Sequence, residues 1–171
     1  MKIVKSSQRL SLVFIDESMT YDIWQNSLDN NNRKYVPDEV FETLEETSLI
    51  VNQIIKNYQS KESPLVFAIF INETKQNIGY VQLVEIPIGY EIGYHINEKF
   101  TNKGYATEAV NLFIDYLKDN TDLDKVYGIA LAINKASRRV LEKTGFTLFF
   151  EGLDLYQGKK RKIIKTVKAV R

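Results

Sequence analysis

The strongest constraint on the fold lies in residues 90–117, where one periodicity gives way to another. Residues 90–97 alternate as a strand does, and from Gly104 apolar side chains recur at three- and four-residue intervals, as on one face of a helix. In the short loop between them, Gly104 and Ala106 would let a ligand approach the main chain closely. A strand that leads directly to a helix N-terminus gathers free N–H groups and the positive end of a helix dipole, which predicts a phosphate-binding site.

The whole chain predicts one mixed α/β domain, residues 1–171, built on a largely antiparallel sheet. Strands are expected at residues 10–14, 65–71, 78–86, 90–97, 125–131, 146–150 and 162–167. Helices are expected at residues 17–28, from Pro37 to about Tyr58, from Gly104 to about Leu117 and from Asn134 to Gly145, with a loop at residues 29–36. The polar segment 72–77 indicates an antiparallel hairpin between the strands that flank it.

Composition excludes several classes of site and partner. The chain has no cysteine, which excludes disulfides and thiolate catalysis, and its single histidine, His95, is a poor basis for a metal site. The formal charge of +1 gives no reason to expect nucleic acid as a partner, and the basic tail after Asp154 is equally explained as a solvated strand. No segment approaches the ~20 apolar residues of a membrane span, so we expect a cytoplasmic protein without membrane contact.

Two segments together resemble the GCN5-related N-acetyltransferase (GNAT) superfamily. They are residues 91–109, EIGYHINEKFTNKGYATEA, and residues 134–146, NKASRRVLEKTGF. The RimJ/RimL-type branch is the most similar, and residues 8–12 and 78–79 also match it, so the resemblance covers nearly the whole chain. It implies the GNAT acyl-CoA N-acyltransferase fold, a twisted and mostly antiparallel sheet of about seven strands flanked by four helices.

The resemblance also implies acetyl-CoA as cosubstrate, with no metal, and assigns residues to it. The main chain of Tyr94, His95 and Ile96 would lie beside the pantetheine arm and the acetyl carbonyl. Asn134 matches a family asparagine that contacts the cofactor, although it is equally explained as a helix N-cap, and Ser137 lies one turn further along. The N–H groups that would hold the pyrophosphate are those of Asn102, Lys103, Gly104, Tyr105, Ala106 and Thr107.

An amine attacks a thioester only in its neutral form, so the reaction requires a base. Glu91 is the first candidate, since its position resembles that of the base glutamate in related enzymes, and His95 shares its face of the strand. The alternatives are a salt bridge for Glu91 and a structural role for His95. Many family members carry a tyrosine as general acid where this chain has Leu141, so Ser137 or water would have to protonate the thiolate, or the thiolate would leave unaided.

These residues predict direct transfer of an acetyl group to a primary amine, because the chain lacks a nucleophile for an acyl-enzyme. A protein or peptide N-terminal amine is the candidate acceptor that the resemblance favours. The alternatives are a non-catalytic acyl-CoA-binding module and a polyamine or antibiotic N-acetyltransferase. Residues 29–62, with seven acidic and four basic side chains, would favour a cationic amine, and an exposed sheet edge could pair in a homodimer.

Overall fold

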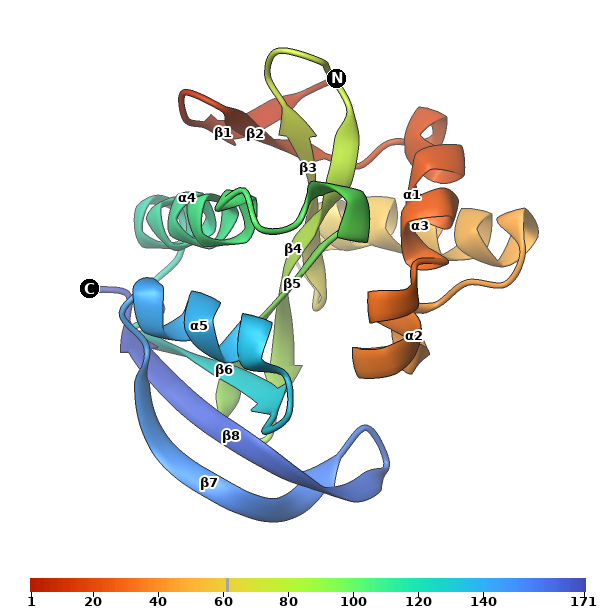
Figure 1. Cartoon of the computed structure of the whole chain (residues 1–171). Helices are drawn as coiled ribbons and strands as arrows, with labels where there is room; N and C mark the ends of the chain where they lie inside the picture. The colour runs from red at the N-terminus through yellow and green to blue at the C-terminus, as the bar shows by residue number, and fades with distance from the viewer. Residues whose placement is uncertain (61) are drawn as a thin grey trace.

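The computed structural model describes residues 1–60 and 62–171, and eight strands of this part form one sheet (Figure 1). The strands are β1 (Ile3–Ser6), β2 (Leu10–Phe14), β3 (Leu65–Ile71), β4 (Asn77–Ile86), β5 (Gly89–Ile96), β6 (Lys125–Leu131), β7 (Thr147–Tyr156) and β8 (Lys159–Ala169). The helices are α1 (Thr20–Ser27), α2 (Asn30–Tyr35), α3 (Leu44–Ser60), α4 (Tyr105–Asn120) and α5 (Lys135–Lys143). Three short 3-10 turns, η1 (Glu17–Met19), η2 (Pro37–Glu39) and η3 (Glu98–Phe100), complete the described elements.

The strands lie in the order β1-β2-β3-β4-β5-β6-β8-β7, and all neighbours are antiparallel except β5 and β6. These two run parallel, because the chain returns through α4 before it enters β6. In their described residues they share only one pair in register, Glu91 and Tyr127. The C-terminal halves of β5 and β6 are therefore not paired with each other, and the sheet opens at its centre.

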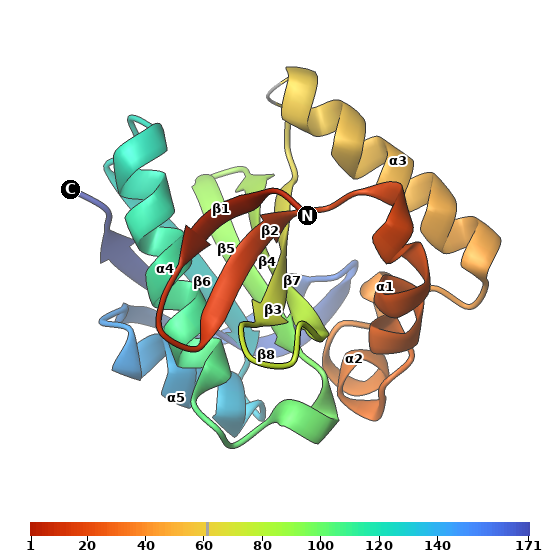
Figure 2. The same ribbon diagram turned by 90° about the horizontal axis from the view of Figure 1, so that it is seen from above.

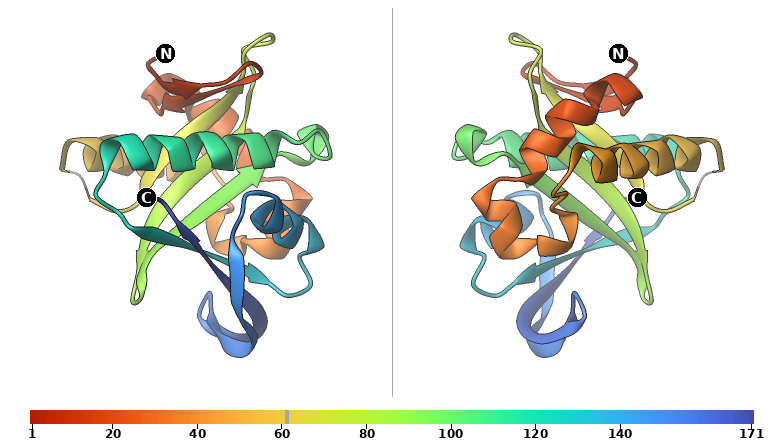
Figure 3. Two further views of the ribbon diagram at one scale, coloured as in Figure 1. Left: turned by 90° about the vertical axis from the view of Figure 1, so that its left-hand side faces the viewer. Right: turned by 90° about the vertical axis from the view of Figure 1, so that its right-hand side faces the viewer.

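Helices cover both faces of the sheet (Figure 2). On one face α4 buries Phe113 and Leu117 completely against core residues that include Leu12 and Phe67. On the other face, residues of α3 such as Val51 form a second cluster with β2 and β3. Each fully buried side chain of this size stabilises the fold by about 1.5 to 3 kcal/mol. Figure 3 shows the two faces from opposite sides, with α4 and α5 in front in one view and α1 and α3 in the other.

Most expected elements are confirmed, and β6 has the predicted bounds. The expected hairpin is β3–β4, and the helices that begin near Gly104 and Asn134 are α4 and α5. The counts of about seven strands and four helices were wrong, since the described residues form eight strands and five α-helices. The additional strand, β1, is a short edge strand that is held by main-chain pairing with β2 rather than by an apolar pattern.

The segment between α1 and α3 differs most from expectation. The predicted loop at residues 29–36 contains α2, because the Asp29 carboxylate accepts a hydrogen bond of 2.8 Å from the N–H of Asn32 and caps the helix. Pro37 begins only the 3-10 turn η2, and α3 begins seven residues later at Leu44. There the Thr43 hydroxyl accepts a hydrogen bond of 3.1 Å from the N–H of Glu46, an N-cap that competes with the start expected at Pro37. Lys61, one of the basic residues counted in segment 29–62, lies outside the described residues.

The last two strands are longer than the expected 146–150 and 162–167. They form a hairpin whose turn residues Gln157 and Gly158 both have positive φ, 52° and 69°. Such a turn matches the twist of the paired strands and carries the pairing out to Tyr156 and Lys159. Among the described residues, every helix is too short or too polar to cross a lipid bilayer.

Candidate active site

The N-terminus of α4 forms an open main-chain site. Its N-cap residue, Gly104, is left-handed, with φ of 79°, and within the described residues no side chain caps it. Asn102 is also left-handed, with φ of 60°. Since the first N–H groups of a helix have no intrahelical acceptor, those of Tyr105, Ala106 and Thr107 remain as donors. This arrangement of main-chain donors at the positive end of a helix suits a phosphate group.

Arg9, from the turn between β1 and β2, supports this loop from behind. Its Nη1 donates to the carbonyl oxygen of Lys103 at 2.9 Å, and its Nε donates to Glu108 Oε2 at 2.7 Å. The guanidinium also lies 4.8 Å from the ring centre of Tyr105. Sequence reasoning gave Arg9 no role, and the only signal was that it falls within the matched segment 8–12. The structure makes it the link between the β1–β2 turn and the start of α4.

A cavity of ≈ 640 Å³ begins at this loop and passes through the sheet. It is lined by Ala106 and Ser137 on the side of α4 and α5, and by Glu39 and Gln82 on the opposite side. Residues from Glu91 to Ile96 of β5 line it on both faces, and three residues of β6 complete the wall. The passage therefore lies where β5 and β6 are unpaired, and it connects the two sides of the molecule.

The cavity brings together nearly all of the site residues expected from the sequence. Lys103 is the exception among them, because its ammonium lies 5.7 Å from the ring centre of Phe100 and it is not part of the lining. The residues that do line the cavity are Glu91, Tyr94, His95, Ile96, Asn102, Gly104, Tyr105, Ala106, Thr107, Asn134 and Ser137. Residues separated by more than forty positions thus converge on one space.

The start of α5 contributes polar groups to the same space. Asn134 is its N-cap and accepts a hydrogen bond of 3.1 Å from the N–H of Ser137, while it also lines the cavity. Two neighbouring arginines of α5 have different surroundings, because Arg138 forms a two-pronged ion pair with Glu151 and Arg139 lines the cavity. Arg138 is therefore held by a structural contact.

Tyr94 contributes a side chain as well as main chain, which the sequence reasoning did not anticipate. Its hydroxyl lies 2.9 Å from Ser137 Oγ and donates to the Ser137 carbonyl at 3.1 Å. Burial raises the pKa of Tyr94 to about 12, and the hydrogen bond with Ser137 acts in the opposite direction. Leu141, at the position of the family tyrosine, is 1% exposed and packs against Gly128. The phenol nearest Ser137 therefore comes from β5 instead of α5.

Glu91 and His95 share one face of β5, as the strand periodicity predicts, and this face is opposite to α4 and α5. Burial raises the pKa of Glu91 to about 7, the negative charge of Glu39 contributes to the rise, and the N–H of Ile129 opposes it. Within the described residues, none of the ion pairs includes Glu91. The salt bridge considered for Glu91 is thus not formed there. A carboxylate in this state can accept a proton near neutral pH.

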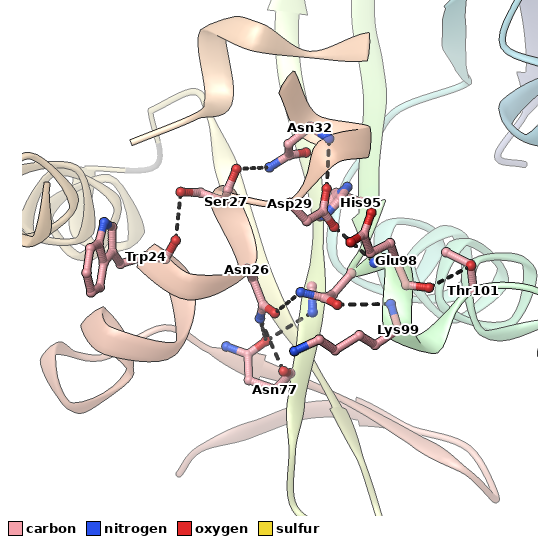
Figure 4. A network of polar contacts seen from close by, with 12 residues as sticks. Trp24, Asn26, Ser27, Asp29, Asn32, Asn77, His95, Glu98, Lys99 and Thr101 are labelled. Atoms are coloured by element: carbon pink, nitrogen blue, oxygen red, sulfur yellow. Dashed lines mark hydrogen bonds and ion pairs between the residues drawn. The ribbon is translucent and has the colours of Figure 1, made fainter. Parts of the chain in front are cut away.

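His95 is buried and faces Asp29, as Figure 4 shows. Its Nε2 lies 2.9 Å from Asp29 Oδ2, at ion-pair distance but without the alignment of a hydrogen bond. The same carboxylate oxygen accepts a hydrogen bond of 3.0 Å from the N–H of Glu98. Burial alone would raise the pKa of Asp29, but the contacts with His95, Asn32 and Glu98 outweigh burial and lower it. His95 is therefore held in a structural network while one of its edges lines the cavity.

Comparison with known protein families supplies the classification. The family model for the acetyltransferase (GNAT) domain matches residues 9–147. The chain belongs to this family. As a GNAT protein it is an N-acetyltransferase, in agreement with the names of its relatives. One of them, the uncharacterized N-acetyltransferase YnaD of Bacillus subtilis (strain 168), is 28% identical over 125 residues, which are 72% of this chain and 70% of YnaD.

Solved structures of GNAT proteins share the fold. A GNAT-family acetyltransferase from Bacillus anthracis superposes with a TM-score of 0.81 at 24% identity, over 97% of this chain and 98% of that one. The ribosomal L7/L12 alpha-N-protein acetyltransferase RimL, solved in complex with coenzyme A, superposes with a TM-score of 0.83 at 21% identity, over 98% of both chains. At these identities the likeness concerns the fold. The uncapped N-terminus of α4 and the cavity that reaches it suit a cosubstrate of the coenzyme A type.

Proposed function

We propose that this GNAT protein transfers the acetyl group of acetyl-CoA directly to a protein or peptide N-terminal amine, with Glu91 as the base. The observation that carries the proposal is the continuous cavity, which connects the free N–H groups at the start of α4 with Glu91 on the opposite side of the sheet. A cosubstrate entering on one side and an amine on the other would meet at β5. Two substrates held in one passage can react without an acyl-enzyme.

The residues that would hold acetyl-CoA are those of the α4 terminus and the unpaired part of β5. Main-chain donors from Asn102 to Thr107 suit the pyrophosphate, with Arg9 fixing the loop from behind. From Tyr94 to Ile96, the edge of β5 that faces β6 has no strand partner, and main-chain groups on this edge are available to the pantetheine amides. The cosubstrate supplies an activated thioester, and the remaining requirements fall on the residues of this chain.

The proposed step balances in bonds and protons. An ammonium group gives one proton to the Glu91 carboxylate, and the neutral nitrogen then attacks the thioester carbonyl carbon. The nitrogen–carbon bond forms and the carbon–sulfur bond breaks. The second amine proton finishes on the sulfur, with the Tyr94–Ser137 pair as the proton donor and acceptor beside it. The proton held by Glu91 returns to solvent, so one proton is released in each cycle.

The pKa of Glu91 favours an α-amine over a lysine side chain. A carboxylate with a pKa of about 7 takes a proton from an α-ammonium with a pKa of roughly 7.7 to 8.0 at a small cost in free energy. For a lysine ammonium with a pKa of about 10.4, the same transfer is uphill by more than 4 kcal/mol, on the basis of 1.36 kcal/mol per unit. The name of RimL, an alpha-N-protein acetyltransferase of similar fold, is consistent with this choice.

The test is mass spectrometry of products from a panel of free N-terminal peptides, polyamines and an aminoglycoside, with thiol release as the rate measurement. We expect acetylation of peptide α-amines, and we expect Glu91→Gln to slow release at least about tenfold, as for loss of a general base. Glu85→Gln is the matched control, because Glu85 is an exposed glutamate of neighbouring β4. Acetylation of polyamines or the aminoglycoside alone would exclude the N-terminal acceptor. No thiol release with any amine would exclude the transfer reaction itself.

A further inference from the structure

The face of β5 that carries Glu91 is covered by a second carboxylate, Glu39 of η2. Sequence reasoning gave Glu39 no catalytic or binding role of its own. We propose that Glu39 and Glu91 form a paired site that binds the acceptor as a protonated primary amine, with Glu39 as the binding residue and Glu91 as the proton acceptor. This inference rests on the proposed function and narrows its substrate to an amine that enters as a cation. The pairing itself can be measured without turnover.

Gly93 makes room for the side chain that positions Glu39. Gly93 lies between Glu91 and His95 on the same face of β5 and is opposite Gln82 in the register with β4. A Cβ atom added to Gly93 would lie 2.8 Å from Gln82 Nε2. The Gln82 side chain therefore crosses β5 directly over Gly93, next to the two side chains that the cavity exposes.

Gln82 in turn holds Glu39 above this face. Its Nε2 donates to Glu39 Oε1 at 2.7 Å, and Glu39, Gln82 and Glu91 all line the same cavity. The other carboxylate oxygen, Glu39 Oε2, is buried and has no hydrogen-bond partner within the described residues. A buried oxygen of this kind requires a donor, and a primary ammonium offers three.

The charges around the pair leave it in need of a cation. Burial raises the pKa of Glu39, Asp38 raises it further, and Gln82 and His95 act in the opposite direction. Tyr156 of β7 faces both carboxylates, and burial together with their charges raises its pKa, while Arg161 of β8 lowers it. Among the ion pairs of the described residues, none includes Glu39. The two carboxylates therefore line one cavity, the charge of Glu39 acts on Glu91, and neither is in an ion pair within the described residues.

A primary ammonium fits this space better than a metal ion. In residues 1–60 and 62–171, no group of three or more histidine, cysteine, aspartate or glutamate side chains is arranged to hold a metal. The cavity lining is partly apolar, and the two carboxylates lie at one end of it. This combination instead suits an alkylammonium ion, whose charged nitrogen would lie at the carboxylates and whose carbon chain would contact the apolar lining. The site would discriminate against a quaternary ammonium, because that cation has no N–H to donate to Glu39 Oε2 and no proton to give to Glu91.

The first experiment measures the pairing by carbon-13 NMR titration of protein labelled at the glutamate carboxyl carbons. In Glu39→Gln, which keeps the shape of the side chain, we expect the pKa of Glu91 to fall by roughly 0.5 to 2 units, as for loss of a nearby like charge. Glu45→Gln, at an exposed position of α3, removes the same charge away from the cavity and should leave Glu91 unchanged. Identical titration of Glu91 in wild type and Glu39→Gln would refute the pairing. If Glu39→Gln does not fold, Gln82→Ala releases Glu39 from β4 and should lower the pKa of Glu91 in the same direction.

The second experiment adds ethylammonium chloride to the labelled protein and compares it with tetramethylammonium chloride at equal ionic strength. We expect ethylammonium to shift the Glu39 and Glu91 resonances and lower both pKa values, and we expect Glu39→Gln to lose this response. An equal response to both salts would show screening alone and contradict the proposal. In acetyl transfer, Glu39→Gln should raise KM for the amine about tenfold and move the acidic limb of kcat/KM to lower pH.

The two proposals can fail separately. If wild-type protein acetylates an amine and Glu39→Gln leaves KM and the pH profile unchanged, the carboxylate pair is wrong and the acetyltransferase function stands. If wild-type protein acetylates no amine but the Glu39 and Glu91 resonances respond to ethylammonium as expected, the ammonium site stands and the proposed transfer reaction is wrong.

Discussion

At the scale of single residues, the contact between Tyr94 and Ser137 places a phenol where the family pattern alone would not put one. The two hydroxyl oxygens are 2.9 Å apart, although the residues come from β5 and α5. Since burial raises the pKa of Tyr94 to about 12, the phenol keeps its proton over the ordinary pH range. It can therefore serve as a hydrogen-bond donor, directly or through Ser137, when a thiolate departs. Tyr94 of β5 would then compensate for Leu141, which stands where many family members have a tyrosine.

We expect Tyr94→Phe to lower kcat by about tenfold or more, as for loss of a proton donor, with little change in KM for acetyl-CoA. The effect should be constant between pH 6 and pH 9, because the phenol does not titrate there. Steady-state kinetics of thiol release measures both parameters. Tyr116→Phe, which removes a hydroxyl from a core ring of α4, is the control and should leave kcat unchanged. A kcat for Tyr94→Phe equal to that of wild type would mean that the thiolate leaves unaided.

At the scale of secondary-structure elements, the cofactor loop depends on the first hairpin of the chain. Arg9 of the β1–β2 turn bonds to Lys103 and Glu108, and the Ser7 hydroxyl donates to Glu108 Oε1 at 2.5 Å. The loop has two left-handed residues, Asn102 and Gly104, so its conformation needs external support. The β1–β2 hairpin is thus part of the proposed phosphate-binding arrangement although it contributes no residue to the cavity lining.

Replacing Arg9 by Met should loosen this loop while preserving most of the apolar stem. We expect the Kd for coenzyme A to rise by roughly 5- to 30-fold, because lost charge-assisted hydrogen bonds worth about 1 to 2 kcal/mol change affinity by that factor. Isothermal titration calorimetry measures it. Arg171→Met is the matched control, since it removes an ion pair with Asp122 near the other end of α4. Equal Kd values for Arg9→Met and wild type would show that the loop keeps its conformation without the contacts of Arg9.

The sequence predicted the elements whose signals are local. Alternation along β5 was enough to put Glu91 and His95 on one face, and Asn134 was predicted as the cap of α5. What it could not predict depends on contacts between distant segments. Gln82, which lies over Gly93, holds Glu39 near Glu91, and no period or motif links η2 to β5. The α2 helix was not predicted because residues 29–36 are polar and loop-like in composition, and the N-cap contact of Asp29 is seen only in the structure.

At the scale of the whole molecule, the sheet divides the reaction between two sides. Figure 1 shows α4 and α5 on one side of β5 and α2 on the other. Residues of α4 and α5 line the end of the cavity suited to acetyl-CoA, and residues of α2 and η2 line the end suited to the amine. The two meet only because β5 and β6 are parallel and largely unpaired. An antiparallel pair bonded along its length would close the passage. The one parallel contact of the sheet is therefore the feature on which transfer between the two sides depends.

Burial of Glu91, the proposed base, should also reduce the stability of the fold. The pKa of Glu91 rises from its ordinary 4.5 to about 7 in the folded protein. Below pH 4.5 both the folded and unfolded states hold the proton, so Glu91 behaves as a neutral group. As the pH rises toward 7, the unfolded state loses its proton first, and the free energy of unfolding therefore falls. Above pH 7 the folded state carries a partly buried charge and this loss is complete.

We expect Glu91→Gln to be more stable than wild type at pH 8 by roughly 1 to 3 kcal/mol, allowing for solvent screening of a partly exposed group, and to match it near pH 4.5. Urea unfolding at the two pH values measures the difference, with Glu85→Gln as a control that should change neither. Combined with a slower reaction, a gain confined to high pH would show that activity and stability oppose each other at this residue. Equal stability of Glu91→Gln and wild type at pH 8 would mean that Glu91 ionises in the folded protein as freely as in the unfolded chain, and its selection as the base on grounds of pKa would then be wrong.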